Sequence, residues 1–353
     1  MRYVGIDLHK RSLTVCVIDK RTGETFDRRF QCSEEAALRK FFGELGPFEA
    51  VIEASGTYEW LWELLEPLAK RLVLAHPKKL RIIAESMKKT DRHDAYLLAW
   101  LLSQDAIPEA HRPTPHQREY QLLVKHRHFL VQSRTKCRNQ LRSLLAARNL
   151  DYTGLFSAKG KARLASLALK PAERFRVEQL LKLHETLEEQ VKTAAKELSK
   201  FRKEAPEAEK KQHAIVTSVP GVGNVTADVV LSTLGDVSRF GSQQKVTAYS
   251  GLVPGFRESA SKRRELGITK QGPRLLRWVL VEAAWQATRY SGHWREVFER
   301  IAERRGRKKA IVAVARKLLA VIYSLLKKGE SYVEKLVIPK RRLRVSAAGI
   351  MKT

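Results

Sequence analysis

Cysteine is scarce in this sequence, whose 353 residues contain only three, namely Cys16, Cys32 and Cys137. They are far apart and odd in number, which argues against a disulfide framework and against a structural zinc site. Long apolar runs are missing as well, because Arg316-Lys317 interrupts the most apolar late stretch, residues 310–326. We therefore expect a cytoplasmic protein with reduced thiols, without a signal peptide and without a membrane span.

Acidic residues are also in short supply, since 38 Asp and Glu stand against 67 Lys and Arg, which gives a formal net charge of +29. The excess increases toward the end of the chain, in basic clusters at 262–264, 304–305, 307–309 and 340–342. Lys and Arg side chains that contact phosphates release condensed counterions, so an excess of this size indicates nucleic acid as the partner. On charge alone, a basic protein that binds nucleic acid without catalysing a reaction remains an alternative.

The first third of the sequence alternates between β-prone and helical patterns. The β-prone runs are residues 3–8, 13–18, 24–30, 50–53 and 72–75, and the helical stretches are 33–45, 58–70, a short helix from Pro77, and 91–102. Turn residues between the early runs indicate a meander of strands that opens a sheet. This order predicts a mixed α/β domain over residues 1–110.

The middle of the sequence has a different period. Pro108, Pro113 and Pro115 predict a linker, and apolar residues then recur every seven positions, at Leu123, Leu130, Cys137 and Leu144 and again at Leu180, Leu187 and Ala194. This spacing predicts two long helices within residues 111–205, paired as an antiparallel hairpin or a short coiled coil that joins subunits. The core of a helical bundle explains the pattern equally well. Residues 151–170, between the two helices, are expected to be irregular.

Four carboxylates of the N-terminal domain need an explanation, namely Asp7, Glu53, Asp91 and Asp94. Asp7 lies within the apolar run 4–8 and Glu53 ends a buried strand, where a carboxylate is costly without a cation. Asp91 and Asp94 lie three residues apart at a helix start and point to one side. With the two strands adjacent, as in ribonuclease-H-like sheets, all four would converge.

Oxygen ligands of this kind favour Mg²⁺ or Mn²⁺, and two ions about 4 Å apart would clamp the attacking and leaving oxygens of a phosphodiester. Taken singly, Asp91 is also explained as a helix N-terminal acid and Glu53 as a strand-end carboxylate. His93 is interpreted as a surface or supporting residue. A rival interpretation compares the run 4–8 with the phosphate loop of sugar kinases and heat-shock ATPases. The basic residues His9-Lys10-Arg11 follow here in place of the small turn that those proteins need, so this rival ranks low.

A third unit is expected over residues 206–353. Its motif Pro220-Gly221-Val222-Gly223 leads into a helix and resembles a helix-hairpin-helix. Backbone N–H groups at Gly221 and Gly223 would receive a DNA phosphate there without reading sequence. A tight structural turn is the alternative.

Two serines, Ser259 and Ser261, lie in a strongly basic segment with Arg257, Lys262, Arg263, Arg264 and Lys270. Cations beside a serine hold a phosphate and stabilise the charge that develops when the hydroxyl attacks. The simpler interpretation is that the serines are solvated or only bind phosphate. A long helix follows, and its Trp278 and Trp285 are expected to belong mainly to the core.

The motifs together resemble the DEDD-type transposases of insertion-sequence family one hundred and ten, which are relatives of the Piv DNA invertases. The likeness runs nearly end to end, in the family's order and approximate spacing. It rests on Gly5-Ile6-Asp7-Leu8-His9-Lys10, Glu53-Ala54-Ser55-Gly56, Lys89-Thr90-Asp91-Arg92-His93-Asp94-Ala95, Pro220-Gly221-Val222-Gly223 and Gly251-Leu252-Val253-Pro254.

The resemblance implies a RuvC-like, ribonuclease-H-type α/β domain whose tetrad falls on Asp7, Glu53, Asp91 and Asp94 with Mg²⁺. It further implies an all-α coiled-coil insert and a mainly α C-terminal transposase domain with an essential serine. That serine falls on Ser259. The family usually continues with glycine, whereas Ala260 and Ser261 follow here, so Ser261 remains a substitute nucleophile.

The resemblance also implies a homo-oligomer, a dimer or tetramer, in which the acidic domain of one subunit meets the serine domain of another and the serine becomes linked to DNA. A non-coding bridge RNA would specify the donor and target DNA. The protein would be prokaryotic and nucleoid-associated when bound. Metal-dependent strand cleavage and exchange is therefore the leading hypothesis, ahead of a RuvC-like junction-resolving endonuclease and a non-enzymatic nucleic-acid-binding protein.

Overall fold

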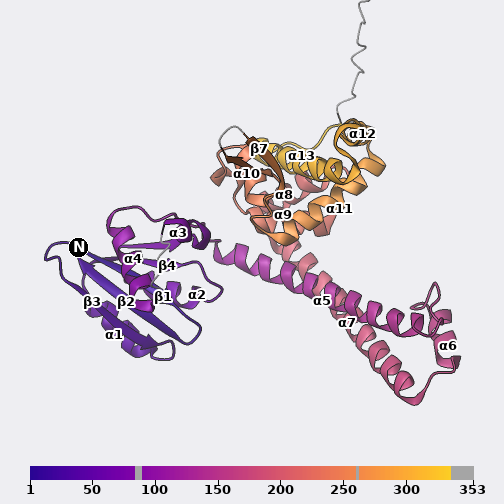
Figure 1. Cartoon of the computed structure of the whole chain (residues 1–353), viewed down its shortest axis with the longest axis horizontal. Coiled ribbons are helices and arrows are strands. Elements are labelled where there is room, and N and C mark those ends of the chain that lie inside the picture. Colours follow the sequence, from indigo (N-terminus) through magenta and orange to yellow (C-terminus); the bar gives the residue numbers. More distant parts are fainter. Residues whose placement is uncertain (84–89, 260–261, 335–353) are drawn as a thin grey trace, which may run out of the picture. The chain divides into compact units, whose positions relative to one another are not determined.

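The computed structural model describes residues 1–83, 90–259 and 262–334, and side chains at 81–83, 256–259 and 262–265 lie outside that description. The chain separates into two compact units, Met1–Pro113 and Thr114–Thr353 (Figure 1). The first is a mixed α/β domain, as predicted, and the second is mostly helical. Among the described helices, none combines the length and apolar character that a membrane crossing requires.

The first unit is built on a five-stranded sheet with the order β3-β2-β1-β4-β5. The strands are β1 (Arg2–Leu8), β2 (Ser12–Asp19), β3 (Thr25–Gln31), β4 (Phe48–Glu53) and β5 (Arg71–Ala75). The first three are antiparallel neighbours, whereas β4 and β5 run parallel to β1. Each β-prone run of the sequence forms one of these strands, and β1 lies at the centre.

The two faces of this sheet are covered by different helices. Val4, Ile6 and Leu8 of β1 face a core that also contains residues of α1 (Glu35–Glu44) and α2 (Glu59–Leu65). The opposite face is covered by α4 (Asp91–Ser103), which packs with Val51 and Val73 through Leu98. The short α3 (Pro77–Ile83) follows β5. Because side chains alternate along a strand, Gly5 and Asp7 lie on the α4 face.

Helix α4 approaches β1 closely at Gly5. A Cβ added there would lie 2.0 Å from the carbonyl oxygen of Ala95 and 2.4 Å from the backbone nitrogen of Ala99. Both alanines are fully buried, so the contact joins three small residues. Any side chain at position 5 would push the helix away from the sheet.

Two long helices open the second unit, α5 (Pro115–Ala146) and α7 (Pro171–Glu204), and they lie side by side with α6 (Ala158–Ser166) at their far end (Figure 1). Buried residues near the end of α5 cluster with the start of α7, and Leu130 and Cys137 cluster with Leu187 and Val191. The helices are therefore antiparallel.

Two details of this region differ from expectation. Pro115 is not part of a linker but the first residue of α5, where its missing N–H costs nothing, and the Thr114 hydroxyl accepts a hydrogen bond from the Gln117 N–H at 3.2 Å. Residues 158–166, expected to be irregular, form α6, which begins at the Ser157 cap and packs Leu164 into the hairpin core. The apolar periodicity of so short a helix is too brief to predict it.

The rest of the second unit is a helical core with one β-hairpin. Its elements are α8 (Glu207–Thr217), α9 (Asn224–Leu234), the 3₁₀ turn η1 (Val237–Arg239), α10 (Gln243–Ser250), β6 (Pro254–Ser259), β7 (Lys262–Ile268), α11 (Arg274–Tyr290), α12 (Gly292–Arg305) and α13 (Arg307–Lys328). One continuous apolar cluster joins the helices. The predicted boundary between residues 205 and 206 stays a prediction.

A buried carboxylate ties four of these helices together. Asp228 on α9 is 3% exposed. Its Oδ1 accepts a hydrogen bond from the Tyr120 hydroxyl at 2.7 Å, and its Oδ2 accepts one from Arg202 Nη1 at 2.7 Å. His213 Nε2 on α8 lies 3.4 Å from Oδ1. Since Tyr120 belongs to α5 and Arg202 to α7, the base of the hairpin is fixed to the C-terminal core.

Replacing Gly5 with alanine tests the close packing of α4. We expect Gly5→Ala to lower the free energy of unfolding of the first unit by about 1–3 kcal/mol, because the neighbouring atoms are backbone and cannot turn aside. Gly43→Ala in α1 is the control, since no atom lies within 4 Å of the added Cβ and alanine favours a helix. Calorimetric unfolding of both variants measures the difference, and a wild-type transition temperature for Gly5→Ala would contradict the packing argument.

Candidate active site

The side chain of Asp7 is placed by strand β1 on the face that α4 covers. It lies two residues beyond Gly5, and its side chain is only 13% exposed. Across the sheet Asp7 pairs with Thr14 of β2, and Thr14 pairs with Arg29 of β3. These side chains form a row that leads from the centre of the sheet to its edge.

The start of α4 carries the second part of the site. The Thr90 hydroxyl caps the helix by accepting a hydrogen bond from the His93 N–H at 3.2 Å, which fixes where the helix begins. Asp91 and Asp94 occupy the first turn, where the positive end of the helix dipole favours carboxylates. His93 contributes its backbone to the cap, and its side chain is exposed.

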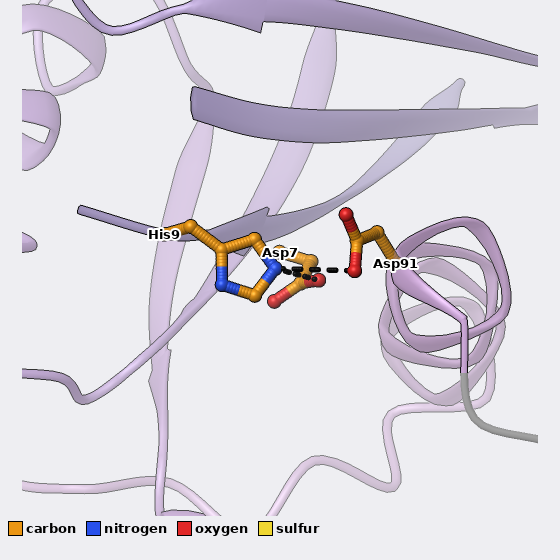
Figure 2. A group of neighbouring side chains, drawn as sticks. All are labelled: Asp7, His9 and Asp91. Atoms are coloured by element: carbon orange, nitrogen blue, oxygen red, sulfur yellow. Dashed lines mark ion pairs between the residues drawn. The ribbon is translucent and has the colours of Figure 1, made fainter. Parts of the chain in front are cut away.

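Asp7, His9 and Asp91 converge, and the His9 ring contacts both carboxylates (Figure 2). His9 Nε2 is 3.1 Å from Asp7 Oδ2 and 3.3 Å from Asp91 Oδ1. One ligand atom from each of these three residues lies within 4.8 Å of the other two. Among the described residues, this is the group whose spacing suits a metal ion.

The other two predicted carboxylates lie near this group but outside it. Glu53 ends β4, and Ile52 is in register with Ile6, so Glu53 and Asp7 follow one another's register at the carboxyl ends of two neighbouring parallel strands. Asp94 follows one turn after the start of α4. Both carboxylates raise the pKa of Asp7, so they are near enough to act on its charge.

Burial is the main reason that the pKa of Asp7 is raised above its ordinary value. His9 opposes the shift, and the charges of Asp94, Asp91 and Glu53 add to it. Asp7 Oδ2 is buried, and it has no hydrogen bond of acceptable geometry even though His9 lies close by. A buried, unsatisfied carboxylate oxygen that faces other carboxylates fits a divalent cation, which would remove both the repulsion and the missing contact.

His9 is the residue of this site that the sequence analysis did not assign. The signal was present, because His9 lies two residues after Asp7, where strand alternation predicts the same face. It was interpreted instead as part of a basic turn that disfavours an ATPase.

Arginine side chains border the acidic group on the β3 side. A pocket beside Asp91 is lined by Thr14, Asp27, Arg28, Arg29, Thr90, Asp91 and Arg92. Arg29 Nη2 is 3.8 Å from Asp91 Oδ2, and Arg92 Nε is 2.8 Å from Asp27 Oδ2. Guanidinium groups next to metal-ligand carboxylates are suited to hold a phosphate.

The serine segment belongs to the second unit and forms the β6–β7 hairpin. Ser259 is the last residue of β6 and pairs with Lys262, while Arg257 pairs with Arg264 and Glu258 with Arg263. Ser261 lies outside the described residues. Lys270 adopts a left-handed backbone with φ of 54°, and its N–H donates to the Gly251 carbonyl at 3.1 Å.

The two glycines of the turn before α9 differ in their surroundings. Gly221 has φ of +80°, and an added Cβ would lie 2.4 Å from the Ala283 carbonyl oxygen of α11, so packing requires glycine there. Gly223 is exposed, caps α9, and has no atom within 4 Å of an added Cβ. Contact of either glycine with a phosphate stays a prediction.

The raised pKa of Asp7 predicts how stability depends on pH without metal. The folded chain keeps this proton to a higher pH than the unfolded chain, so stability is lost as pH rises from the ordinary carboxyl pKa through the raised folded value. In EDTA at pH 7, Asp7→Asn should therefore unfold at a higher temperature than wild type, and the difference should shrink toward about pH 4. Calorimetry measures both trends.

The control for this prediction is Asp105→Asn, which removes an exposed ion pair with Arg71 and suits asparagine because φ is 53°. It should not raise the unfolding temperature. If Asp7→Asn is less stable than wild type throughout this pH range, then the charge of Asp7 does not destabilise the folded chain.

Comparisons with known proteins identify the family. The model described as "Transposase IS116/IS110/IS902 family" matches residues 213–299, and a DEDD-type transposase model of the IS110 group matches residues 4–148.

The transposase for insertion sequence element IS1111A of Coxiella burnetii is 28% identical over 94% of this chain and 91% of its own length. The transposase for element IS1328 of Yersinia enterocolitica is 27% identical over 80% of this chain and 82% of its own length. The pilin gene-inverting protein of Moraxella bovis is 23% identical over 95% of this chain and 98% of its own length. The chain therefore carries transposase domains of the IS110/IS116/IS902 family.

Proposed function

We propose that this protein cuts and exchanges DNA strands at the ends of an insertion element, and that the acidic site of the first unit takes part in the cleavage. The observation that carries this proposal is the convergence of Asp7 and Asp91 around a buried, unsatisfied carboxylate oxygen. The sheet order is compatible with the ribonuclease-H-type domain that the family resemblance implies. The formal net charge of +29 favours binding of DNA, whose phosphates are negatively charged.

Mg²⁺ is the proposed cofactor, with Mn²⁺ as a substitute. Asp7 and Asp91 would hold it, and Glu53 and Asp94 complete the tetrad that the resemblance implies. When bound, such an ion stabilises negative charge on the oxygens of a phosphodiester. His9, when protonated, reduces the repulsion between Asp7 and Asp91, since its Nε2 lies close to both.

The arginines beside Asp91 would position the DNA strand. Arg29 and Arg92 each face a carboxylate at present, at 3.8 and 2.8 Å respectively. A phosphate in the adjoining pocket offers the same guanidinium groups a bidentate partner. Their role would be to align the backbone so that the reacting phosphodiester meets the acidic group.

Ser259 is the proposed nucleophile. Its Oγ would form a bond to phosphorus while the bond from phosphorus to the leaving sugar oxygen breaks. The hydroxyl proton passes to solvent, and the leaving oxygen takes up a proton. The strand end stays attached to the protein until a second sugar hydroxyl displaces the serine, so no external energy source is needed.

Family resemblance supports two further parts of the proposal. The first is a homo-oligomer, a dimer or tetramer, in which the serine of one subunit works with the acidic site of another. The second is a non-coding bridge RNA that specifies donor and target DNA. Recombination assays should therefore contain the element's own RNA.

Loss of either converging carboxylate should abolish recombination. We expect Asp7→Asn and Asp91→Asn to lower the rate of recombination between plasmid-borne donor and target sites by about a hundredfold or more, since metal-assisted charge stabilisation is worth several kcal/mol. DNA binding at fixed salt should stay within about threefold of wild type. Asp105→Asn is the matched control, because it lies in the same unit in an exposed ion pair. Full recombination by Asp7→Asn would reject the acidic site.

Serine substitution separates the transposase from a junction-resolving nuclease. Ser259→Ala should prevent both strand exchange and the protein–DNA adduct seen on a denaturing gel, while binding of DNA persists. Ser261→Ala is the control and should recombine. If Ser259→Ala still cuts but Ser261→Ala does not, the nucleophile is Ser261. If both cut without an adduct, water is the nucleophile and the chain is a metal nuclease.

A further inference from the structure

Trp278 of α11 lies half exposed over a hollow in the second unit. The sequence analysis placed Trp278 and Trp285 mainly in the core, but their exposures are 49% and 38%. The hollow beneath Trp278 is formed by α5, α7, α9 and α11, and its wall includes Val225, which is 42% exposed. The placement is unexpected because an indole ring buries more apolar area than most side chains when it joins a core.

The two tryptophans differ in their neighbours. Trp285 packs on Phe298 with ring centroids 5.6 Å apart, so it is an extension of the apolar core. Trp278 faces His128 of α5, at 5.4 Å between centroids. One tryptophan is therefore supported by an aromatic core residue, and the other by a polar ring at the edge of a hollow.

Positive charge surrounds Trp278. Arg127 and His128 line the same hollow, and Arg274 precedes Trp278 by one helical turn. The pKa of His128 is lowered, mainly by burial and then by the charges of Arg127 and Arg274, so both guanidinium groups act at this place. Within the described part of the chain, neither arginine forms an ion pair with a carboxylate.

The carboxylate that lines this hollow is already satisfied. Asp228 is the lining carboxylate, and Tyr120 and Arg202 each donate a hydrogen bond to it at 2.7 Å. Its charge raises the pKa of Arg127, but burial has the larger effect and the pKa is lowered overall. The cations around Trp278 therefore have capacity left for an anion.

We propose that this surface binds single-stranded nucleic acid, with an unpaired base stacked on Trp278 and the flanking phosphates held by Arg274 and Arg127. Stacking on an aromatic ring requires a base whose face is free, which excludes an intact duplex at this point. A protein helix laid on Trp278 would bury Arg127, His128 and Arg274 without partners, and this costs free energy. A phosphate backbone satisfies the cations and the base satisfies the indole.

The charges along α11 also indicate where the phosphates lie. Arg274 lies one turn before Trp278, at the positive end of the helix, and Glu282 lies one turn after it. The phosphates are therefore expected over the N-terminal end of α11. This inference rests on the proposed function only in requiring a nucleic-acid partner, and its test needs no cleavage.

Binding of short labelled strands to the full-length protein in EDTA tests the stacking. With twelve-nucleotide single-stranded DNA and RNA read by fluorescence anisotropy, Trp278→Ala should weaken binding about 5- to 100-fold. Trp278→Phe should keep most of the affinity because it still stacks, whereas Trp278→Leu should behave like the alanine variant. Trp285→Ala is the matched control, on the same helix and also exposed, and should stay within about twofold of wild type.

Replacing the arginine tests the phosphate contact. Arg274→Gln should lower affinity and reduce the slope of log affinity against log salt by about 0.7, the value for one phosphate of a single strand. Arg289→Gln is the control, because Arg289 is exposed in the last turn of the same helix. Equal slopes for wild type and Arg274→Gln would overturn the phosphate assignment.

Three outcomes would overturn the stacking site. The first is an equal loss of affinity for Trp278→Ala and Trp285→Ala, and the second is wild-type affinity of Trp278→Leu. The third is unchanged affinity of Trp278→Ala together with a change in its molar mass by light scattering. That result would assign the surface to a second copy of the chain. The DNA and RNA arms show which strand depends on Trp278. Asp7→Asn should bind like wild type, so a failed recombination test with an intact Trp278 effect rejects the proposed function alone.

Discussion

The contact between Gly5 and helix α4 is the constraint on which the acidic site depends. Hydrogen at the Gly5 Cα lets the backbone of Ala95 and Ala99 lie against the strand, closer than any side chain permits. With the helix held at this distance, its first turn reaches the row that starts at Asp7. The ion pair between Arg92 and Asp27 holds the same helix end to β3, so α4 is fixed at two places on the sheet. The geometry of the acidic group is therefore a consequence of packing between small residues.

The same packing creates an electrostatic cost that the site retains. Asp7 is enclosed by the sheet and α4, and its neighbours are carboxylates, so burial and repulsion act on it together. A hydrophobic residue of similar size at this position would avoid both costs. His9 compensates only in part, because its distance to Asp7 is that of an ion pair while Asp7 Oδ2 still lacks a hydrogen bond. Unfavourable charge in the folded chain is what a divalent ion would relieve.

Much of the first unit was predictable, since period-two runs and helix caps are local. Thr90, Asp91 and Asp94 form a helix start recognisable from the sequence alone, and Asp7 is conspicuous in an apolar strand. The role of Gly5 was not predictable, because it depends on a helix some ninety residues away in the chain. In the second unit, helical periodicity could not distinguish a buried tryptophan from Trp278, whose exposure depends on how α5, α7 and α9 pack beside it. The β6–β7 hairpin was missed because its basic residues resemble a solvated loop.

Asp228 fixes the base of the long hairpin of α5 and α7 to the C-terminal core. Helix α7 has 34 residues and extends for about 50 Å at 1.5 Å per residue. At its base, Arg202 and Tyr120 hold one buried carboxylate of α9, so the hairpin cannot swing there without separating charged hydrogen bonds in a dry environment. A force applied to the hairpin near α6 would therefore be transmitted to α9. The base of the hairpin and α9, which follows the turn of Gly221 and Gly223, are therefore joined in one packed body.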